Sequence, residues 1–229
     1  MLRQCANGRR ARMGAGPKKW RKERTLMPIF GNEPVTVRVK PADLARFDDA
    51  ELAGLNDARE ALLGSHLAAT DARLAVRRAR DDCERISARR RGAKADVKLA
   101  KAERSSVSAH TDAQGALEAE RSISSAQGEK SLLDMRIAWL RAEVAAAEAR
   151  EAEMNAGAWA AEADYELEGA RLLSSDRTRG EANLQAFVRQ VEECHKALEN
   201  ARQRSVQRRT EADKQKNAWQ RASVPLEPV

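Results

Sequence analysis

Residues 48–83 read DDAELAGLNDAREALLGSHLAATDARLAVRRARDDC, and this stretch decides the fold. Two sets of mostly small or apolar residues recur every seven positions through it and beyond. The first set is Leu55, Leu62, Ala69, Val76, Cys83 and Val97, interrupted at Arg90, and the second is Ala58, Ser65, Ala72, Ala79, Ile86, Ala93 and Ala100. A repeat of 3.5 residues is typical of a long helix that packs along a narrow seam in a coiled coil.

The start of this helix carries its own signal. Asp48 and Glu51 have the spacing of a capping box, in which each side chain accepts a hydrogen bond from the backbone N–H of the other residue. Phe47 and Leu52 flank the cap with the spacing of a hydrophobic staple. We therefore expect the helical body to begin at residue 48.

The same repeat returns twice farther along the chain. It runs from Leu132 to Ala170 and again from Leu184 to Trp219. Serine-rich or glycine-containing stretches between the seams predict a first turn near 105–111 or near 122–128, and a second turn at 174–180. Short connectors favour antiparallel neighbours. The sequence predicts an all-α fold, either a long antiparallel coiled-coil hairpin or a three-helix bundle, with a helical body over 48–222 and a tail over 223–229.

The overall composition agrees with long helices. Of the 229 residues, 34% are charged and only 3% are aromatic, so the 42% hydrophobic fraction is dominated by small side chains. A compact core of this chain length needs large apolar residues, because burial energy scales with apolar area. An α/β enzyme and a β-sandwich are therefore disfavoured.

The segment before the body has a different pattern. Residues 28–47 contain VTVRVK at 35–40, which alternates apolar and polar residues and is bracketed by Pro34 and Pro41. That period is typical of a half-buried strand, but a single strand needs an edge to pair with. The segment is predicted to be an extended leader, either with a single strand over 35–40 or simply extended.

The first 27 residues are strongly basic. They hold nine Lys and Arg residues against Glu23 alone, a net charge of +8, whereas the rest of the chain sums to −1 of the total +7. With almost nothing apolar to bury, this arm is predicted to be disordered. Four interpretations of this arm remain open. It is a nucleic-acid-binding arm, a surface for an acidic protein, a mitochondrial targeting segment, or a stretch that is not translated because synthesis starts at Met27.

Residues with catalytic or metal-binding chemistry are sparse. His66, His110 and His195 are isolated, and adjacent Cys194 and His195 point about 100° apart on a helix. The phosphate-loop, dinucleotide, HExxH and GxSxG motifs are all missing from the sequence. We expect no enzyme activity, no cofactor, no metal and no small-molecule substrate. Three widely spaced cysteines favour a reducing compartment, and no apolar run is long enough for a membrane span. The cytoplasm is the expected location, with mitochondria as the alternative.

Two functions remain. The first is a non-enzymatic structural or scaffolding protein that binds partner subunits or associates with itself in a larger assembly. The alternative is a nucleic-acid-binding component of a ribonucleoprotein such as a ribosome. Residues expected to contact nucleic acid or an acidic partner are Arg9, Arg10, Arg12, Lys18, Lys19, Arg21, Lys22, Arg89, Arg90 and Arg91.

Large apolar residues form two bands that are wider than one narrow seam. We expect these bands to contact partner helices, and the isolated monomer to be unstable, because seams rich in alanine bury little area. The residues are Leu132, Met135, Ile137, Trp139, Leu140, Leu184, Phe187, Val188 and Val191.

Overall fold

A computed structural model describes residues 35–107, 113–175 and 183–223. The chain divides by contact into residues 1–33 and residues 34–229, and all described residues belong to the second unit. The elements are α1 (Pro41–Leu44), α2 (Ala53–Val107), α3 (Ala113–Ser175) and α4 (Leu184–Ser223). The described residues contain no β-strand, so the all-α prediction is confirmed.

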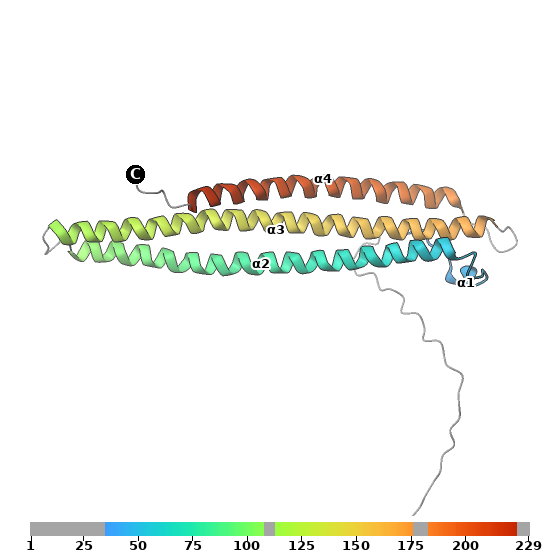
Figure 1. Ribbon diagram of the computed structural model, residues 1–229, viewed down its shortest axis with the longest axis horizontal. Helices are drawn as coiled ribbons and strands as arrows, with labels where there is room; N and C mark the ends of the chain where they lie inside the picture. Colours follow the sequence, from blue (N-terminus) through green and yellow to red (C-terminus); the bar gives the residue numbers. More distant parts are fainter. Residues whose placement is uncertain (1–34, 108–112, 176–182, 224–229) are drawn as a thin grey trace, which may run out of the picture. The chain divides into compact units, whose positions relative to one another are not determined.

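Helix α3 lies between the other two long helices (Figure 1). It packs against both α2 and α4, whereas no Cα atom of α2 lies within 8 Å of one in α4. The chain reverses direction between consecutive helices, so each pair is antiparallel, as Figure 1 shows. The central helix therefore buries two faces, and each outer helix buries one.

Two apolar seams of α3 explain this arrangement. Leu133, Ile137 and Leu140 are buried with Ile86 and Ala93 of α2. An adjoining set faces α4: Ala160 and Ala163 pack with Cys194, and Leu167 and Ala170 pack with Phe187. Near the C-terminal end of α4, Trp219 stacks on Trp139 with ring centroids 4.9 Å apart, and Arg136 lies over the Trp219 ring. The band around Leu132–Leu140 is wide because α3 meets a second neighbour there.

The predicted capping box is confirmed. The Asp48 N–H donates to Glu51 Oε2 at 2.9 Å, and the Glu51 N–H donates to Asp48 Oδ1 at 2.8 Å. A hydrogen-bonded turn over 49–52 follows it, and the regular helix α2 begins at Ala53.

The helix ends decide between the two expected positions of the first turn. Helix α2 ends at Val107 and α3 begins at Ala113, whereas residues 122–128 are helical and lie inside α3. The alternative turn at 122–128 is therefore wrong. Helix α3 ends at Ser175 within the predicted second turn, and the connectors 108–112 and 176–182 lie outside the described residues.

The leader differs in part from its prediction. Residues 35–40 form no strand and run extended, but α1 follows at Pro41–Leu44, where only extended chain was expected. Proline is favourable at the first turn of a helix because its fixed φ suits the helix. It also loses no hydrogen bond there, since a backbone N–H at that position has no acceptor within the helix. The N–H of Ala45 donates to the Pro41 carbonyl at 3.1 Å and closes this single turn. Within the described residues the leader thus ends in a helical turn before Phe47.

Candidate interaction surfaces

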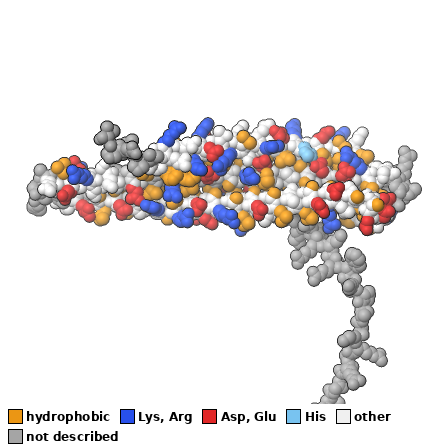
Figure 2. Space-filling model, viewed as in Figure 1, with side chains coloured by type: hydrophobic (Ala, Val, Ile, Leu, Met, Phe, Trp, Pro, Cys, Tyr) orange, Lys and Arg blue, Asp and Glu red, His pale blue; other side chains and the backbone are white. Residues whose placement is uncertain are grey.

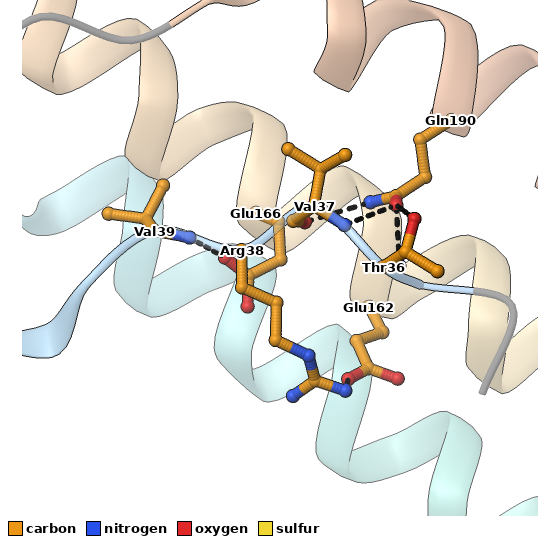
Figure 3. Close-up of polar contacts among 7 residues, drawn as sticks. All are labelled: Thr36, Val37, Arg38, Val39, Glu162, Glu166 and Gln190. Atoms are coloured by element: carbon orange, nitrogen blue, oxygen red, sulfur yellow. Dashed lines mark hydrogen bonds and ion pairs between the residues drawn. The ribbon is translucent and has the colours of Figure 1, made fainter.

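The extended residues 35–39 lie against α3 and α4, held by buried polar side chains (Figure 3). Gln190 of α4 is 6% exposed. Its Oε1 accepts hydrogen bonds from the N–H groups of Thr36 and Val37, each at 2.8 Å, and its Nε2 donates to the Val37 carbonyl at 3.0 Å. One side-chain amide thus replaces the bonds that a neighbouring β-strand would supply.

Two glutamates of α3 hold the next part of this segment. Glu166, 8% exposed, accepts the Val39 N–H through Oε2 at 2.7 Å. Glu162 forms an ion pair with Arg38 at 2.8 Å. Burial raises the pKa of Glu166, while the Val39 N–H and the Arg38 charge lower that pKa to a smaller extent. We call the seat formed by Glu162, Glu166 and Gln190 with its apolar floor the leader cradle.

The apolar floor of the leader cradle receives alternate residues of the segment. Val35 is only 1% exposed and packs with Ala160, Ala163 and Cys194. Val37 and Val39 pack against the cluster of Leu167, Ala170 and Phe187. Thr36 and Arg38 are exposed. The alternation noted in the sequence therefore reflects a half-buried extended segment, although no strand pairs with it.

A second surface is an open groove over α3. It has a volume of about 680 Å³ and is lined by residues of α2, α3 and α4. Alanines form much of it: Ala72, Ala75 and Ala79 come from α2, and Ala146 and Ala147 come from α3. Val206 of α4 also lines the groove and is 62% exposed. We call it the alanine groove.

Among the residues that the structure describes, only some of the charged side chains in the alanine groove form ion pairs. Arg209 pairs with Glu143 at 3.2 Å and with Asp213 at 3.0 Å. Arg150 and Arg202 also line the groove and are exposed. Small side chains with a charged rim are what a docking helix needs to approach closely.

Other apolar side chains lie among charges on the surface. Figure 2 shows one face, where hydrophobic residues are interspersed with Lys, Arg, Asp and Glu. Leu63, Leu67 and Leu74 of α2 are exposed, and their spacing of four and seven residues places them on one side of that helix. They add a short apolar row on α2.

The basic cluster of α2 is partly neutralised by α3. Arg89 pairs with Glu129 at 3.1 Å, and Arg90 pairs with Asp134, which also pairs with Lys130 at 2.8 Å. Hydrogen bonds from Lys130 and, to a smaller extent, Arg90 hold the pKa of Asp134 below its ordinary value. Arg91 is exposed and lines a shallow depression with Glu84. The predicted contacts in the arm, at Arg9, Arg10, Arg12, Lys18, Lys19, Arg21 and Lys22, lie outside the described residues.

The residues expected to contact partner helices are divided by the structure. Ile137, Leu140 and Phe187 are buried within this chain. Leu132, Met135, Trp139, Leu184 and Val191 are half-buried. Val188 is the exception, with 40% of its surface exposed. Of this set, Val188 has the most surface left for another molecule.

The adjacent residues Cys194 and His195 both lie where α4 contacts α3. Cys194 is buried, and burial raises the pKa of its thiol. His195 is exposed, and its Nε2 lies 3.0 Å from Oδ2 of Asp164 in α3. Among the described residues no cluster of three His, Cys, Asp or Glu side chains has the arrangement of a metal site. None of the described helices has a stretch that is both long and apolar enough to cross a bilayer.

Sequence pattern alone missed Gln190 and Glu166. Glu166 lies between Ala163 and Ala170, at the three- and four-residue spacings of one helix face, and Gln190 has the same relation to Phe187 and Cys194. A polar residue on an otherwise apolar face was the signal that could have found them.

In comparisons with known proteins, no family model, no curated protein and no solved structure matches this chain.

Proposed function

We propose that this chain is a non-enzymatic scaffolding protein whose helical bundle binds a helix of a partner subunit or of a second copy of itself. The observation that carries the proposal is the alanine groove. Helices α2 and α4 flank α3 with no Cα atom of one within 8 Å of a Cα atom of the other, and a space of about 680 Å³ lies over α3 between them. A further helix seated there would contact all three helices at once.

The side chains of the groove support a helical occupant. Helix axes pack 8–10 Å apart, and small residues at the contact permit the shorter separations. Ala75, Ala79 and Ala147 offer such a surface. Val206 lines the same groove and is largely exposed to water. Full burial of a valine side chain contributes about 1.5–3 kcal/mol of favourable free energy. Arg150 and Arg202 favour carboxylates on the flanks of the docking helix.

The described part of the basic cluster favours scaffolding over the nucleic-acid alternative. Arg89 and Arg90 already pair with Glu129 and Asp134, so each would lose an ion pair before it could bind a phosphate. The case for a ribonucleoprotein component then depends on the arm of residues 1–27. Binding to nucleic acid that falls steeply with salt and disappears on deletion of residues 1–26 would favour that alternative.

Site-specific photo-crosslinking tests the scaffolding proposal. A photoreactive amino acid replaces Val206 in the full chain within cells of the native source, and mass spectrometry locates the crosslinked residues. The matched control replaces Leu117, which is 56% exposed on α3 and does not line the groove. We expect position 206 to crosslink to a helical segment of one protein, which is the partner or a second copy, at a yield well above that of position 117.

Light scattering with charge variants completes the test. If the occupant is a second copy, Val206→Glu shifts the chain toward monomer and Leu117→Glu does not. If it is another subunit, Val206→Glu removes that subunit from the purified complex. A chain that stays monomeric and whose position 206 crosslinks no better than position 117 would overturn the proposal.

A further inference from the structure

The leader cradle contacts the main chain of residues 35–39 through side chains of α3 and α4. Gln190 bonds the N–H of Thr36 and both polar groups of Val37, and Glu166 bonds the N–H of Val39. These acceptors and donors are side chains that lie 127–154 residues away in the sequence. Binding of an extended peptide by satisfying its main chain and seating alternate side chains is an established mode of recognition.

The side chains of the segment supply the selectivity. Val35 fills a fully enclosed position, Val37 and Val39 pack on the floor, and Arg38 reaches Glu162 at 2.8 Å. A ligand for this seat therefore has β-branched residues at alternate positions and a cation between the second and third of them. Such β-branched residues also favour the extended backbone that the seat requires.

We infer that the leader cradle is a binding site for an extended Val-x-Val-Arg-Val peptide, filled here by the chain's own residues 35–39 acting as an exchangeable ligand. The described contacts of residues 35–39 are made with α3 and α4, and none of them depends on the covalent link to α1. The same segment supplied by a second molecule can therefore make the same contacts. Covalent attachment gives the chain's own segment an effective concentration in the millimolar range, so it outcompetes a free peptide.

A binding experiment with an emptied cradle tests this. The full chain carries Val35→Glu and Val37→Glu, which leave Glu162, Glu166 and Gln190 unaltered. The probe is a fluorescent peptide of residues 35–40, capped at both ends, and its binding is followed by fluorescence anisotropy. We expect the emptied chain to bind the probe at least tenfold more tightly than the wild-type chain. Adding Gln190→Ala should weaken binding to the emptied chain at least tenfold, and a probe with Glu at positions 35 and 37 should not bind.

Hydrogen exchange of the backbone amides in the wild-type chain is a second measurement, and it does not require the emptied variant to fold. The amides of Thr36 and Val37 should be protected, and they should open while the interior amides of α3 and α4 stay closed, as expected for a local opening. The inference is overturned if the emptied chain fails to bind the probe at millimolar concentration while its helicity is intact. It is equally overturned if leader and helix amides open together, because the leader is then an integral part of the core.

Discussion

Gln190 bonds Val37 at both polar groups of its backbone. The Val37 N–H donates to Gln190 Oε1 at 2.8 Å, and Gln190 Nε2 donates to the Val37 carbonyl at 3.0 Å. These two residues are 153 positions apart in the sequence. A buried carboxamide in this position satisfies backbone groups that would otherwise lose water without gaining a partner. The pair thus joins the extended leader to α4.

Replacing Gln190 by Ala should therefore destabilise the protein. The change leaves the Thr36 and Val37 backbone groups without their partner, and each unsatisfied buried group costs about 1–3 kcal/mol. We expect the free energy of unfolding to fall by about 2 kcal/mol or more in a urea titration. Gln203→Ala is the control, because Gln203 is exposed on the same helix and bonds only Glu199 four residues away among the described contacts. Equal stability of the two variants would contradict the assigned contacts.

Replacing Glu166 by Gln should change how stability depends on pH. Burial raises the folded-state pKa of Glu166 above its ordinary value of 4.5, so the folded chain holds this proton more tightly than the unfolded chain. Its contribution to stability is present at low pH and is lost as pH rises from about 4.5 through the folded pKa. Glutamine keeps an oxygen that can accept the Val39 N–H and carries no charge to bury.

The free energy of unfolding of Glu166→Gln should accordingly fall less than that of the wild type over this pH range. At pH 7 the variant should be at least as stable as the wild type. Urea titrations at a series of pH values measure both quantities. Glu168→Gln, at an exposed ion pair with Arg171, controls for loss of a carboxylate on the same helix. A variant clearly less stable than wild type at pH 7 would show that the Glu166 charge itself is needed.

A charge at Ile137 should lower the stability of the fold far more than a charge at Val188. Ile137 is 6% exposed within the cluster shared by α2 and α3, so Ile137→Glu buries a carboxylate and should lower the unfolding free energy by several kcal/mol. Val188→Glu lies on an exposed part of α4 and should change it by no more than about 0.5 kcal/mol. If the apolar bands also contact a partner, light scattering should show weaker assembly for Val188→Glu at unchanged helicity. An Ile137→Glu chain as stable as wild type would contradict the packing of α3 on α2.

The sequence repeat predicts the seams because the residues of a coiled coil that contact the neighbouring helix recur at a short, regular spacing. Leu55, Leu62, Ala69 and Val76 of the first α2 seam are all buried, and the Asp48–Glu51 cap depends only on residues three apart. The turn at 122–128 was ambiguous because α3 is covered there by α2 but not by α4. Fewer apolar positions are needed in that part of the helix, so Ser124, Ser125 and Gly128 are tolerated on its exposed sides.

The leader cradle could not be predicted in the same way. Its contacts join residue 37 to residue 190 and residue 39 to residue 166, and no local period encodes such distances. Residues 35–40 do alternate, but alternation indicates one buried side and not the element that covers it. Likewise, the bands at Ile137 and Phe187 show that a wide apolar face is needed. Whether this face contacts the same chain or another depends on which faces of α3 are covered by α2 and which by α4.

Two glycines of α3 offer a stability test that separates helix propensity from leader packing. Alanine is about 1 kcal/mol better than glycine inside a helix. A Cβ at Gly157 would lie 3.8 Å from Leu198 Cδ1, whereas a Cβ at Gly169 would lie 3.4 Å from Val39 Cγ2 and 3.7 Å from Leu44 Cδ2. Both contacts are tolerable, but the one at Gly169 is tighter and falls on the leader and α1.

We therefore expect Gly157→Ala to raise the unfolding free energy by about 1 kcal/mol, and Gly169→Ala to raise it by less. Gly128→Ala, where a Cβ would have nothing within 4 Å, provides the reference for propensity alone. Enlarging the side chain further, as in Gly169→Leu, places atoms where Val39 and Leu44 lie and should expel the leader. In that variant the Thr36 and Val37 amides should lose their protection from hydrogen exchange while α3 stays helical. If Gly169→Leu leaves those amides protected, the leader does not lie across this face of α3.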